Sequence, residues 1–122
     1  MAKSNTGMLG EDAATEFLCS NGYTITERNY HSRFGEIDII ATRENYIIFA
    51  EVKTRKTNSM LLPREAVDAK KQRRLIMTTK MYLSTHDIGT FQPRFDVIEV
   101  TTCTGSTFKV DKINHIESAF TL

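Results

Sequence analysis

Two short apolar runs separated by three polar residues constrain the fold of this chain more than any other feature. The runs cover residues 36–42 and 46–53, and Arg43-Glu44-Asn45 lies between them. Both runs are rich in β-branched and aromatic residues, which favour strands, and so short a connection joins antiparallel neighbours. The sequence therefore predicts a β-hairpin, and because its apolar character is nearly continuous we expect both strands inside a sheet.

The turn also predicts which residues of the hairpin face each other. A symmetric turn centred on residues 44–45 places Asp38 opposite Glu51, and Glu36 opposite Lys53. Residues paired in this way share a face of the sheet, with Cβ atoms about 4.5–5.5 Å apart. The hairpin is therefore predicted to bring two carboxylates together and to set a lysine opposite a third.

Alternation of side chains along each strand assigns the other hairpin residues to faces of the sheet. In the first strand Glu36 and Asp38 share one face, and Ile37 and Ile39 share the other. In the second strand the apolar residues around Glu51 point away from its carboxylate. Both acidic residues of the predicted pair therefore lie on one face of a mostly apolar hairpin.

Two opposed carboxylates on adjacent apolar strands pose an electrostatic problem. Like charges directly opposite each other destabilise a sheet, and unpaired carboxylates in an interior cost still more free energy. A hard divalent cation resolves the conflict, because Mg²⁺ takes oxygen ligands, usually one or two carboxylates with water and substrate phosphate. Asp38 and Glu51 are therefore predicted metal ligands, with Mg²⁺ as the expected ion and Mn²⁺ as a substitute.

Lys53 suits a catalytic role beside this pair. Its ammonium can orient or help to deprotonate an attacking water, or stabilise the charge that develops in phosphoryl transfer. The alternative is an ordinary cross-strand salt bridge with Glu36, worth roughly a few tenths of a kcal/mol. The opposed carboxylates and the basic segment that follows favour the catalytic interpretation.

The basic residues of the chain are concentrated in one segment. The formal net charge of the chain is only +1, yet residues 53–80 hold nine basic residues and two acidic ones. A solvated helix face and a phosphate-binding surface both account for this clustering. On the second interpretation, the predicted nucleic-acid contacts are Arg55, Lys56, Lys70, Lys71, Arg73 and Arg74.

The remaining segments predict an α/β domain. Apolar periodicity predicts helices over residues 8–21 and 64–85, the second starting near Pro63, and strands over residues 23–30, 94–100 and 107–111. Residues 54–62 have no periodicity and are predicted to form a loop that contacts substrate, and residues 113–120 a short helix or irregular structure. This order predicts a mixed sheet with helices packed on it, in a single domain spanning residues 1–122.

Other signals exclude several classes of protein. The longest apolar run, residues 46–50, is far shorter than the roughly 20 residues that cross a bilayer, and residues 1–7 are not expected to form a signal peptide. Cys19 and Cys103 have no metal-binding or redox spacing, so we expect reduced thiols in a cytoplasmic protein. The three histidines have no mutual spacing of metal ligands.

The hairpin residues resemble those of a known nuclease superfamily. Gly35-Glu36-Ile37-Asp38 followed by Phe49-Ala50-Glu51-Val52-Lys53-Thr54-Arg55 is similar to the motif of the PD-(D/E)xK nucleases, although no proline precedes Asp38. More narrowly, the chain resembles the small bacterial UPF0102 (YraN-like) family, relatives of the archaeal Holliday junction resolvases. The other matching residues are Gly10-Glu11, Ala14, Asn29-Tyr30, Phe34-Gly35 and Arg94-Phe95-Asp96-Val97.

The resemblance implies a restriction-endonuclease-like core with a metal site at the hairpin. It implies that Asp38 and Glu51 bind the metal, that the carbonyl of Val52 is a third ligand, and that Lys53 is catalytic. It also makes Glu11 a candidate ligand or water-positioning acid, whereas its pattern alone is that of a solvated helix residue.

These observations favour a metal-dependent endonuclease that hydrolyses phosphodiester bonds of DNA, on branched or otherwise non-standard structures. The alternatives are a non-catalytic nucleic-acid-binding module with a nuclease-like fold, and an assembly subunit whose basic helix contacts an acidic protein. Resemblance to resolvases also points to a homodimer, because a symmetric junction suits twofold symmetry. A part for Gln72, on the helix after the motif, stays open, with a surface role as the default.

Overall fold

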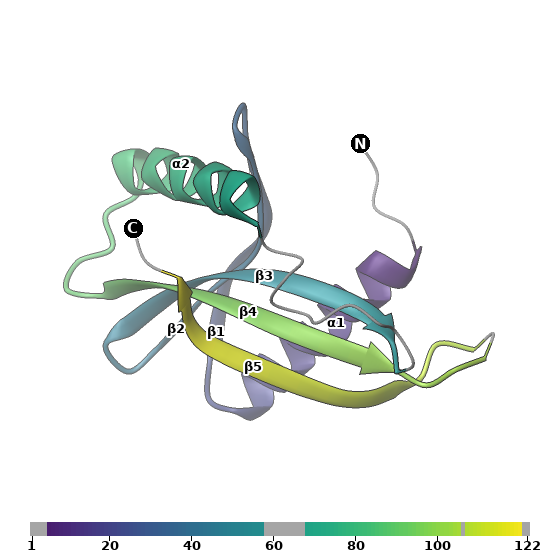
Figure 1. Ribbon diagram of the computed structural model, residues 1–122. Coiled ribbons are helices and arrows are strands. Elements are labelled where there is room, and N and C mark those ends of the chain that lie inside the picture. The colour runs from purple at the N-terminus through teal and green to yellow at the C-terminus, as the bar shows by residue number, and fades with distance from the viewer. Residues whose placement is uncertain (1–4, 58–67, 106, 121–122) are drawn as a thin grey trace.

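The computed structural model describes residues 5–57, 68–105 and 107–120. The elements in chain order are α1 (Asn5–Ser20), β1 (Thr24–Ser32), β2 (Gly35–Arg43), β3 (Tyr46–Lys56), α2 (Ala69–Thr85), β4 (Gln92–Thr102) and β5 (Val110–Phe120) (Figure 1). The strands form one sheet in the order β1-β2-β3-β4-β5, in which β3 and β4 are parallel and the other neighbours antiparallel. The predicted fold class, an α/β mixed sheet flanked by helices, is confirmed.

The two helices cover opposite faces of the sheet (Figure 1). On one face Leu18 of α1 belongs to a buried cluster with Ile48 and Ala50 of β3, and on the other Leu75 of α2 clusters with Phe49. Successive side chains of β3 therefore pack alternately into two separate cores, one on each face of the sheet. The apolar run of β3 is nearly continuous for this reason. The prediction that the hairpin strands lie inside the sheet is confirmed. No helix in the described part of the chain is long and apolar enough to cross a membrane.

The hairpin of β2 and β3 has the predicted register near its turn and opens beyond it. The ladder runs from Arg43 paired with Tyr46 to Ile39 paired with Ala50. The first residues of β2, before Ile39, do not pair with β3. They stay paired with β1 as far back as Gly35, while β3 continues beside β4. From this point the sheet is therefore split into β1 with β2 on one side and β3, β4 and β5 on the other.

The pairs predicted beyond this point, Asp38 with Glu51 and Glu36 with Lys53, are therefore wrong. Neither pair belongs to the ladder, because β2 follows β1 rather than β3 over these residues. In Figure 1 the tip of the β1–β2 hairpin rises from the sheet beside α2. A symmetric turn fixes the register near the turn but does not decide how far the ladder extends.

The tip of the β1–β2 hairpin is held against α2. Ser32 Oγ donates a 3.2 Å hydrogen bond to Thr78 Oγ1. Ile37 packs in the cluster on the α2 side of the sheet and Ile39 in the cluster on the α1 side, so their predicted shared face is wrong. Asn29, which lies across from this stretch on β1, has a φ of 54°, a left-handed conformation that asparagine adopts more readily than most residues. The two strands therefore twist as they leave the sheet.

β3 and α2 differ from their predicted boundaries. Residues 54–56 belong to β3 rather than to a loop, because β3 pairs with β4 to its last residue. α2 begins at Ala69, where the carboxylate of Asp68 caps the helix and accepts a 2.9 Å hydrogen bond from the N–H of Lys71. The predicted helix start near Pro63 and residues 58–62 of the predicted loop lie outside the described residues.

The prediction for the C-terminal residues is wrong. β5 pairs with β4, so the strand predicted over residues 107–111 begins later, and residues 113–120 are strand rather than a short helix or irregular structure. β5 lies at the edge of the sheet, and its exposed and half-buried residues do not alternate regularly. Register shifts interrupt its ladder as well, so the sequence carries no clear period of two there.

A buried polar cluster ties β5 to β4. Asp96 of β4 is fully buried, and its carboxylate accepts hydrogen bonds from Arg94 at 2.8 and 2.9 Å, from His115 at 2.7 Å and from the N–H of Ser118 at 3.1 Å. Burial raises the pKa of Asp96, but the hydrogen bonds from His115 and Arg94 outweigh burial and hold the pKa below its ordinary value. Asp96 is therefore a charged anchor for the edge strand.

Replacing Asp96 with Asn should destabilise the protein by about 3 kcal/mol, because Arg94 stays buried without the buried charge of Asp96, and its ion pair with the exposed Glu117 is a longer one, at 3.8 Å. The pKa of Asp96 is depressed, so its stabilising effect is present above the ordinary pKa of aspartate and is lost as the pH falls through the folded-state pKa. Urea unfolding at pH 7 measures the loss. Asp12→Asn, which removes an exposed ion pair with Arg28, is the matched control and should cost less than about 1 kcal/mol. An equally small loss for Asp96→Asn would contradict the anchoring role.

Candidate active site

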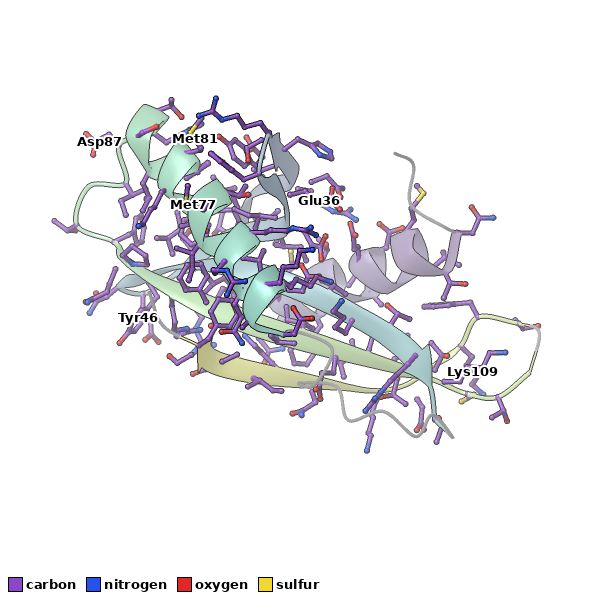
Figure 2. All side chains as sticks on the ribbon, turned by 45° about the horizontal axis from the view of Figure 1, so that its top comes forward. Glu36, Tyr46, Met77, Met81, Asp87 and Lys109 are labelled. Carbon is purple, nitrogen blue, oxygen red and sulfur yellow. The ribbon has the colours of Figure 1, made fainter. Side chains whose placement is uncertain are left out.

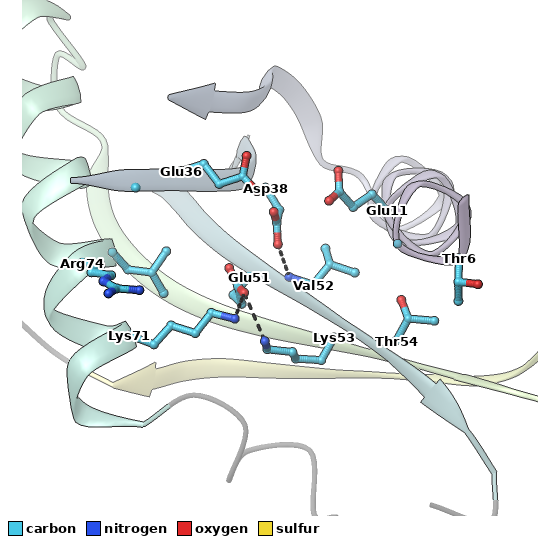
Figure 3. Close-up of a pocket in the computed structure, with 13 residues that line it drawn as sticks. Thr6, Glu11, Glu36, Asp38, Glu51, Val52, Lys53, Thr54, Lys71 and Arg74 are labelled. Atoms are coloured by element: carbon cyan, nitrogen blue, oxygen red, sulfur yellow. Dashed lines mark hydrogen bonds and ion pairs between the residues drawn. The ribbon is translucent and has the colours of Figure 1, made fainter. Parts of the chain in front are cut away.

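The opening between β2 and β3 forms a cavity of about 540 Å³. Its lining includes Glu11 of α1, Asp38 of β2, Glu51 and Lys53 of β3, and Lys71 of α2 (Figure 3). Because β2 has left its neighbour, the gap reaches both faces of the sheet, and residues of both helices line it. The predicted metal ligands and catalytic residues therefore meet in one place, together with Lys71.

The carboxylate of Asp38 takes the place of a strand partner for β3. In a continued ladder the N–H of Val52 would pair with the backbone of Ile37, but it donates a 2.8 Å hydrogen bond to Asp38 Oδ2 instead. The N–H and C=O of one strand residue point to the same side, so the carbonyl of Val52 is directed into the opening. The three predicted metal ligands, Asp38, Glu51 and Val52, therefore border the same gap.

A metal at this gap would have to be held by few protein ligands. No group of three or more His, Cys, Asp or Glu side chains in the described residues has an arrangement that could hold a metal ion. Asp38 and Glu51 are 3% and 6% exposed, and their oxygens are donors of the kind that hard divalent cations prefer. The residues present fit an ion that takes two carboxylates, a backbone carbonyl, water and substrate oxygens.

Glu51 contacts two ammonium groups. Its Oε1 lies 2.7 Å from Nζ of Lys71 and 3.4 Å from Nζ of Lys53 (Figure 3). The pKa of Glu51 is raised to about 7, first by burial and then by the charge of Asp38, although both lysines lower it. Near neutral pH the site therefore disfavours the state in which Asp38 and Glu51 are both ionised.

The two lysines have opposite pKa shifts. Burial lowers the pKa of Lys53, and its hydrogen bond with Lys71 lowers it further, against the opposing charge of Glu51. Burial also lowers the pKa of Lys71, but its hydrogen bond with Glu51 and the charge of Glu51 outweigh burial and raise it. Lys71 therefore holds its proton firmly, and Lys53 is the better candidate for exchanging a proton with water.

Glu11 is buried in the same cavity, and its description as a solvated helix residue is wrong. Its side chain is 4% exposed, and its Oε1 lies 3.9 Å from Nη2 of Arg28. The side chain reaches from α1 toward Asp38 (Figure 3). The preceding Gly10 brings α1 against β3, because a Cβ at this position would overlap Oγ1 of Thr54. This close approach of helix and strand carries Glu11 to the site.

The predicted nucleic-acid contacts of α2 separate into two pairs. Lys71 and Arg74 line the cavity, whereas Lys70 and Arg73 are exposed outside it. Sequence analysis did not predict the contact between Lys71 and Glu51. A signal was nevertheless available: Leu75 is buried, and the residue one helical turn before it points to the same face.

The predicted contacts of β3 lie on opposite faces of the sheet. Strand alternation puts Arg55 on the face of Lys53 and Lys56 on the other. Lys56 lines a separate hollow of about 330 Å³ on the α1 side. Of these two residues, only Arg55 therefore shares a face with the site.

The fold and the cavity define a small α/β protein with a carboxylate–lysine cluster where two interior strands part. The chain belongs to the family described as "Uncharacterised protein family UPF0102", whose model matches residues 10–100. It is 41% identical over 118 residues to a UPF0102 protein of Caldanaerobacter subterraneus, covering 97% of this chain and 96% of the relative. It is 42% identical over 116 residues to one of Persephonella marina (95% and 93%), and 44% identical over 116 residues to one of Alkaliphilus oremlandii (93% and 96%). The family inferred from the hairpin motif is confirmed.

Replacing Gly10 with Ala should destabilise the protein by about 1–3 kcal/mol, because the new methyl group overlaps Thr54. In most helices the same change stabilises by up to about 1 kcal/mol, so the sign of the effect is diagnostic. Urea unfolding measures it, and the control is the same substitution in a Thr54→Ala background. The loss should shrink there, and an equal loss in both backgrounds would show that the helix–strand contact is not the cause.

The stability of the metal-free protein should fall as the pH rises from 5 to 8. The pKa of Glu51 is raised, so the folded state binds its proton more tightly than the unfolded state, and the stabilising effect present at low pH is lost through about pH 7. The expected contribution is about 2–3 kcal/mol. Urea unfolding in EDTA across this range, compared with Glu51→Gln, isolates the effect. Parallel pH profiles for the two proteins would refute it.

Proposed function

We propose that the chain is a metal-dependent endonuclease that hydrolyses phosphodiester bonds in DNA. The proposal rests on the meeting of two buried carboxylates, Asp38 and Glu51, with the ammonium of Lys53 in one cavity. Buried like charges cost free energy, and perturbed titratable groups gathered in a cavity are typical of catalytic sites. Membership of the UPF0102 family supports the fold and leaves the activity to experiment.

Mg²⁺ is the proposed cofactor, and Mn²⁺ would substitute for it. Asp38, Glu51 and the carbonyl of Val52 would hold the ion, and water and a substrate phosphate would complete its shell. When bound, the ion would polarise the scissile phosphate and acidify an attacking water. The described residues that line the cavity include no histidine or cysteine, the ligands typical of zinc.

Lys53 and Glu11 are the proposed partners of the attacking water. Lys53 has a lowered pKa, which brings its ammonium closer to the range in which it exchanges a proton with water. In its charged form the same group would stabilise the charge that develops on the phosphate oxygens. Glu11 approaches the cavity from α1 and would orient the water through its carboxylate.

The proposed substrate is DNA of branched or otherwise non-standard structure, bound through its phosphates. α2 contains no acidic residue, and Lys70 and Arg73 are exposed beside Arg74 at the cavity. Phosphate contacts of this kind position a nucleic acid without reading its bases. A homodimer belongs to the proposal, because a branched substrate with twofold symmetry offers two equivalent phosphates.

The protein should cleave a labelled synthetic DNA junction in Mg²⁺ or Mn²⁺ and not in EDTA. Duplex and single-stranded DNA, assayed in parallel, report substrate preference. Lys53→Ala and Asp38→Asn should each lower the cleavage rate by about 100-fold or more, because each removes a group that acts on the reacting phosphate or water. Lys109→Ala is the matched control, since Lys109 lies in the loop between β4 and β5, away from the cavity (Figure 2).

Two outcomes would contradict the proposal. One is cleavage by the Lys53 and Asp38 variants at the wild-type rate, which would point to a contaminating nuclease. The other is absence of cleavage on every substrate and with either metal. Salt-dependent binding of the junction without any product would instead support a non-catalytic binding module with this fold.

A further inference from the structure

Lys71 contacts the carboxylate that a metal ion would need. Its Nζ lies 2.7 Å from Oε1 of Glu51, closer than the 3.4 Å of Lys53, and it is also attracted by the charge of Asp38. Its backbone is fixed at the start of α2, where its N–H is capped by Asp68 at 2.9 Å. The long side chain can therefore change position while its root stays in place.

The charges around Glu51 balance without a metal. When Glu51 is ionised, Asp38 and Glu51 bring two negative charges, and the ammonium groups of Lys53 and Lys71 bring two positive ones. A divalent cation on the same carboxylates would create an excess of positive charge, and it would compete with Lys71 for Glu51. Like charges a few ångströms apart repel strongly in a partly buried site. The ion and the ammonium of Lys71 are therefore alternatives.

We propose that Lys71 is an internal counter-ion of the metal-free site, which a divalent cation displaces from Glu51 and which then binds a phosphate of the substrate. The second half of this inference rests on the proposed nuclease function. The side chain of Lys71 is 37% exposed, and Arg74, close to one turn further along α2, lines the same cavity. An outward turn of the four-carbon stem brings the ammonium toward Arg74 and the exposed basic residues of the helix.

Lys53 is not an equivalent candidate for displacement. It lies two residues from Glu51 on the same face of β3, and its side chain is only 22% exposed. β3 is paired with β4 along this stretch, so the backbone of Lys53 stays beside Glu51, and its less exposed side chain has less room than that of Lys71 to turn away from the carboxylates. The helix residue is therefore the mobile charge and the strand residue the fixed one.

This exchange couples metal binding to nucleic-acid binding. A bound ion releases a phosphate-binding ammonium, and a bound phosphate holds that ammonium away from Glu51. Each ligand therefore raises the affinity of the site for the other, and by linkage the two effects are equal. The metal-free protein gains an ion pair that offsets the repulsion between its buried carboxylates.

The test measures metal affinity and DNA affinity in the full-length chain. Mn²⁺ is titrated into wild-type, Lys71→Met and Lys80→Met proteins under argon at pH 8.5, a pH at which Glu51 is ionised. The EPR signal of the free ion reports how much Mn²⁺ is bound. Lys71→Met should bind Mn²⁺ about fivefold more tightly or better, and Lys80→Met, which loses an exposed charge on the same helix, should stay within about twofold of wild type. Lys71→Gln replaces Lys71→Met if the latter does not fold.

A second measurement tests the coupling directly. Fluorescence anisotropy of a labelled four-way DNA junction is recorded with Ca²⁺ and with EDTA, so that binding is measured without cleavage. The metal should raise the affinity of wild type and Lys80→Met, and the gain should be smaller by about fivefold or more for Lys71→Met. A gain of equal size in all three proteins would overturn the phosphate-binding half of the inference.

The outcomes separate this inference from the proposed function. Mn²⁺ binding by Lys71→Met that is equal to or weaker than that of wild type overturns the counter-ion role. Absence of Mn²⁺ binding by both wild type and Lys71→Met overturns it as well. Tighter Mn²⁺ binding by Lys71→Met in a protein that cleaves no DNA would retain the counter-ion role and reject the nuclease. DNA cleavage by wild type together with unchanged metal affinity would reject the counter-ion role alone.

Discussion

The hydrogen bond from the N–H of Val52 to the carboxylate of Asp38 allows the sheet to open in its interior. A strand that loses its neighbour leaves backbone donors without partners, and a buried unpaired donor costs free energy comparable to a lost hydrogen bond. Here an acidic side chain accepts the bond at 2.8 Å, so the ladder between β2 and β3 ends without an orphaned donor at Val52. The same hydrogen bond holds the carboxylate of Asp38 at the gap. One interaction therefore both satisfies the backbone donor of Val52 and positions an acidic residue of the site.

The opening in turn decides which helices take part in the site. In a closed sheet, residues of α1 and α2 would remain on opposite faces and could not share a cavity. Because the gap reaches both faces, Glu11 of α1 and Lys71 of α2 line one hollow around Glu51. Charged groups are therefore gathered in a buried place, and the pKa of Glu51 is raised because burial and the charge of Asp38 disfavour its ionised form. A fold selected for stability alone would not be expected to retain two acidic groups there.

Short-range patterns account for most of what the sequence predicts correctly. The apolar runs and their turn define the hairpin, its interior position and its register as far as Ile39, and the hairpin motif identifies the family. The opening is not predictable in this way, because it involves contacts between residues far apart in the chain, such as Ser32 with Thr78. Most of β5 was not predicted, because an edge strand needs no regular alternation and the anchor of this strand at Asp96 is a tertiary contact. Local alternation also cannot reveal that β2 twists between Ile37 and Ile39.

The contact between Lys71 and Glu51 follows from the topology rather than from either residue's own pattern. β3 and β4 are parallel, so the chain must return across the sheet before β4 begins, and such a crossover usually contains a helix. That helix is α2, which packs on the face of the sheet to which Glu51 and Lys53 point. An acid at this place on β3 therefore meets the first turns of the crossover helix, and a cation there lies beside the acid. The motif on one strand and the basic residues of the next helix thus form a single site because of the parallel pair between them.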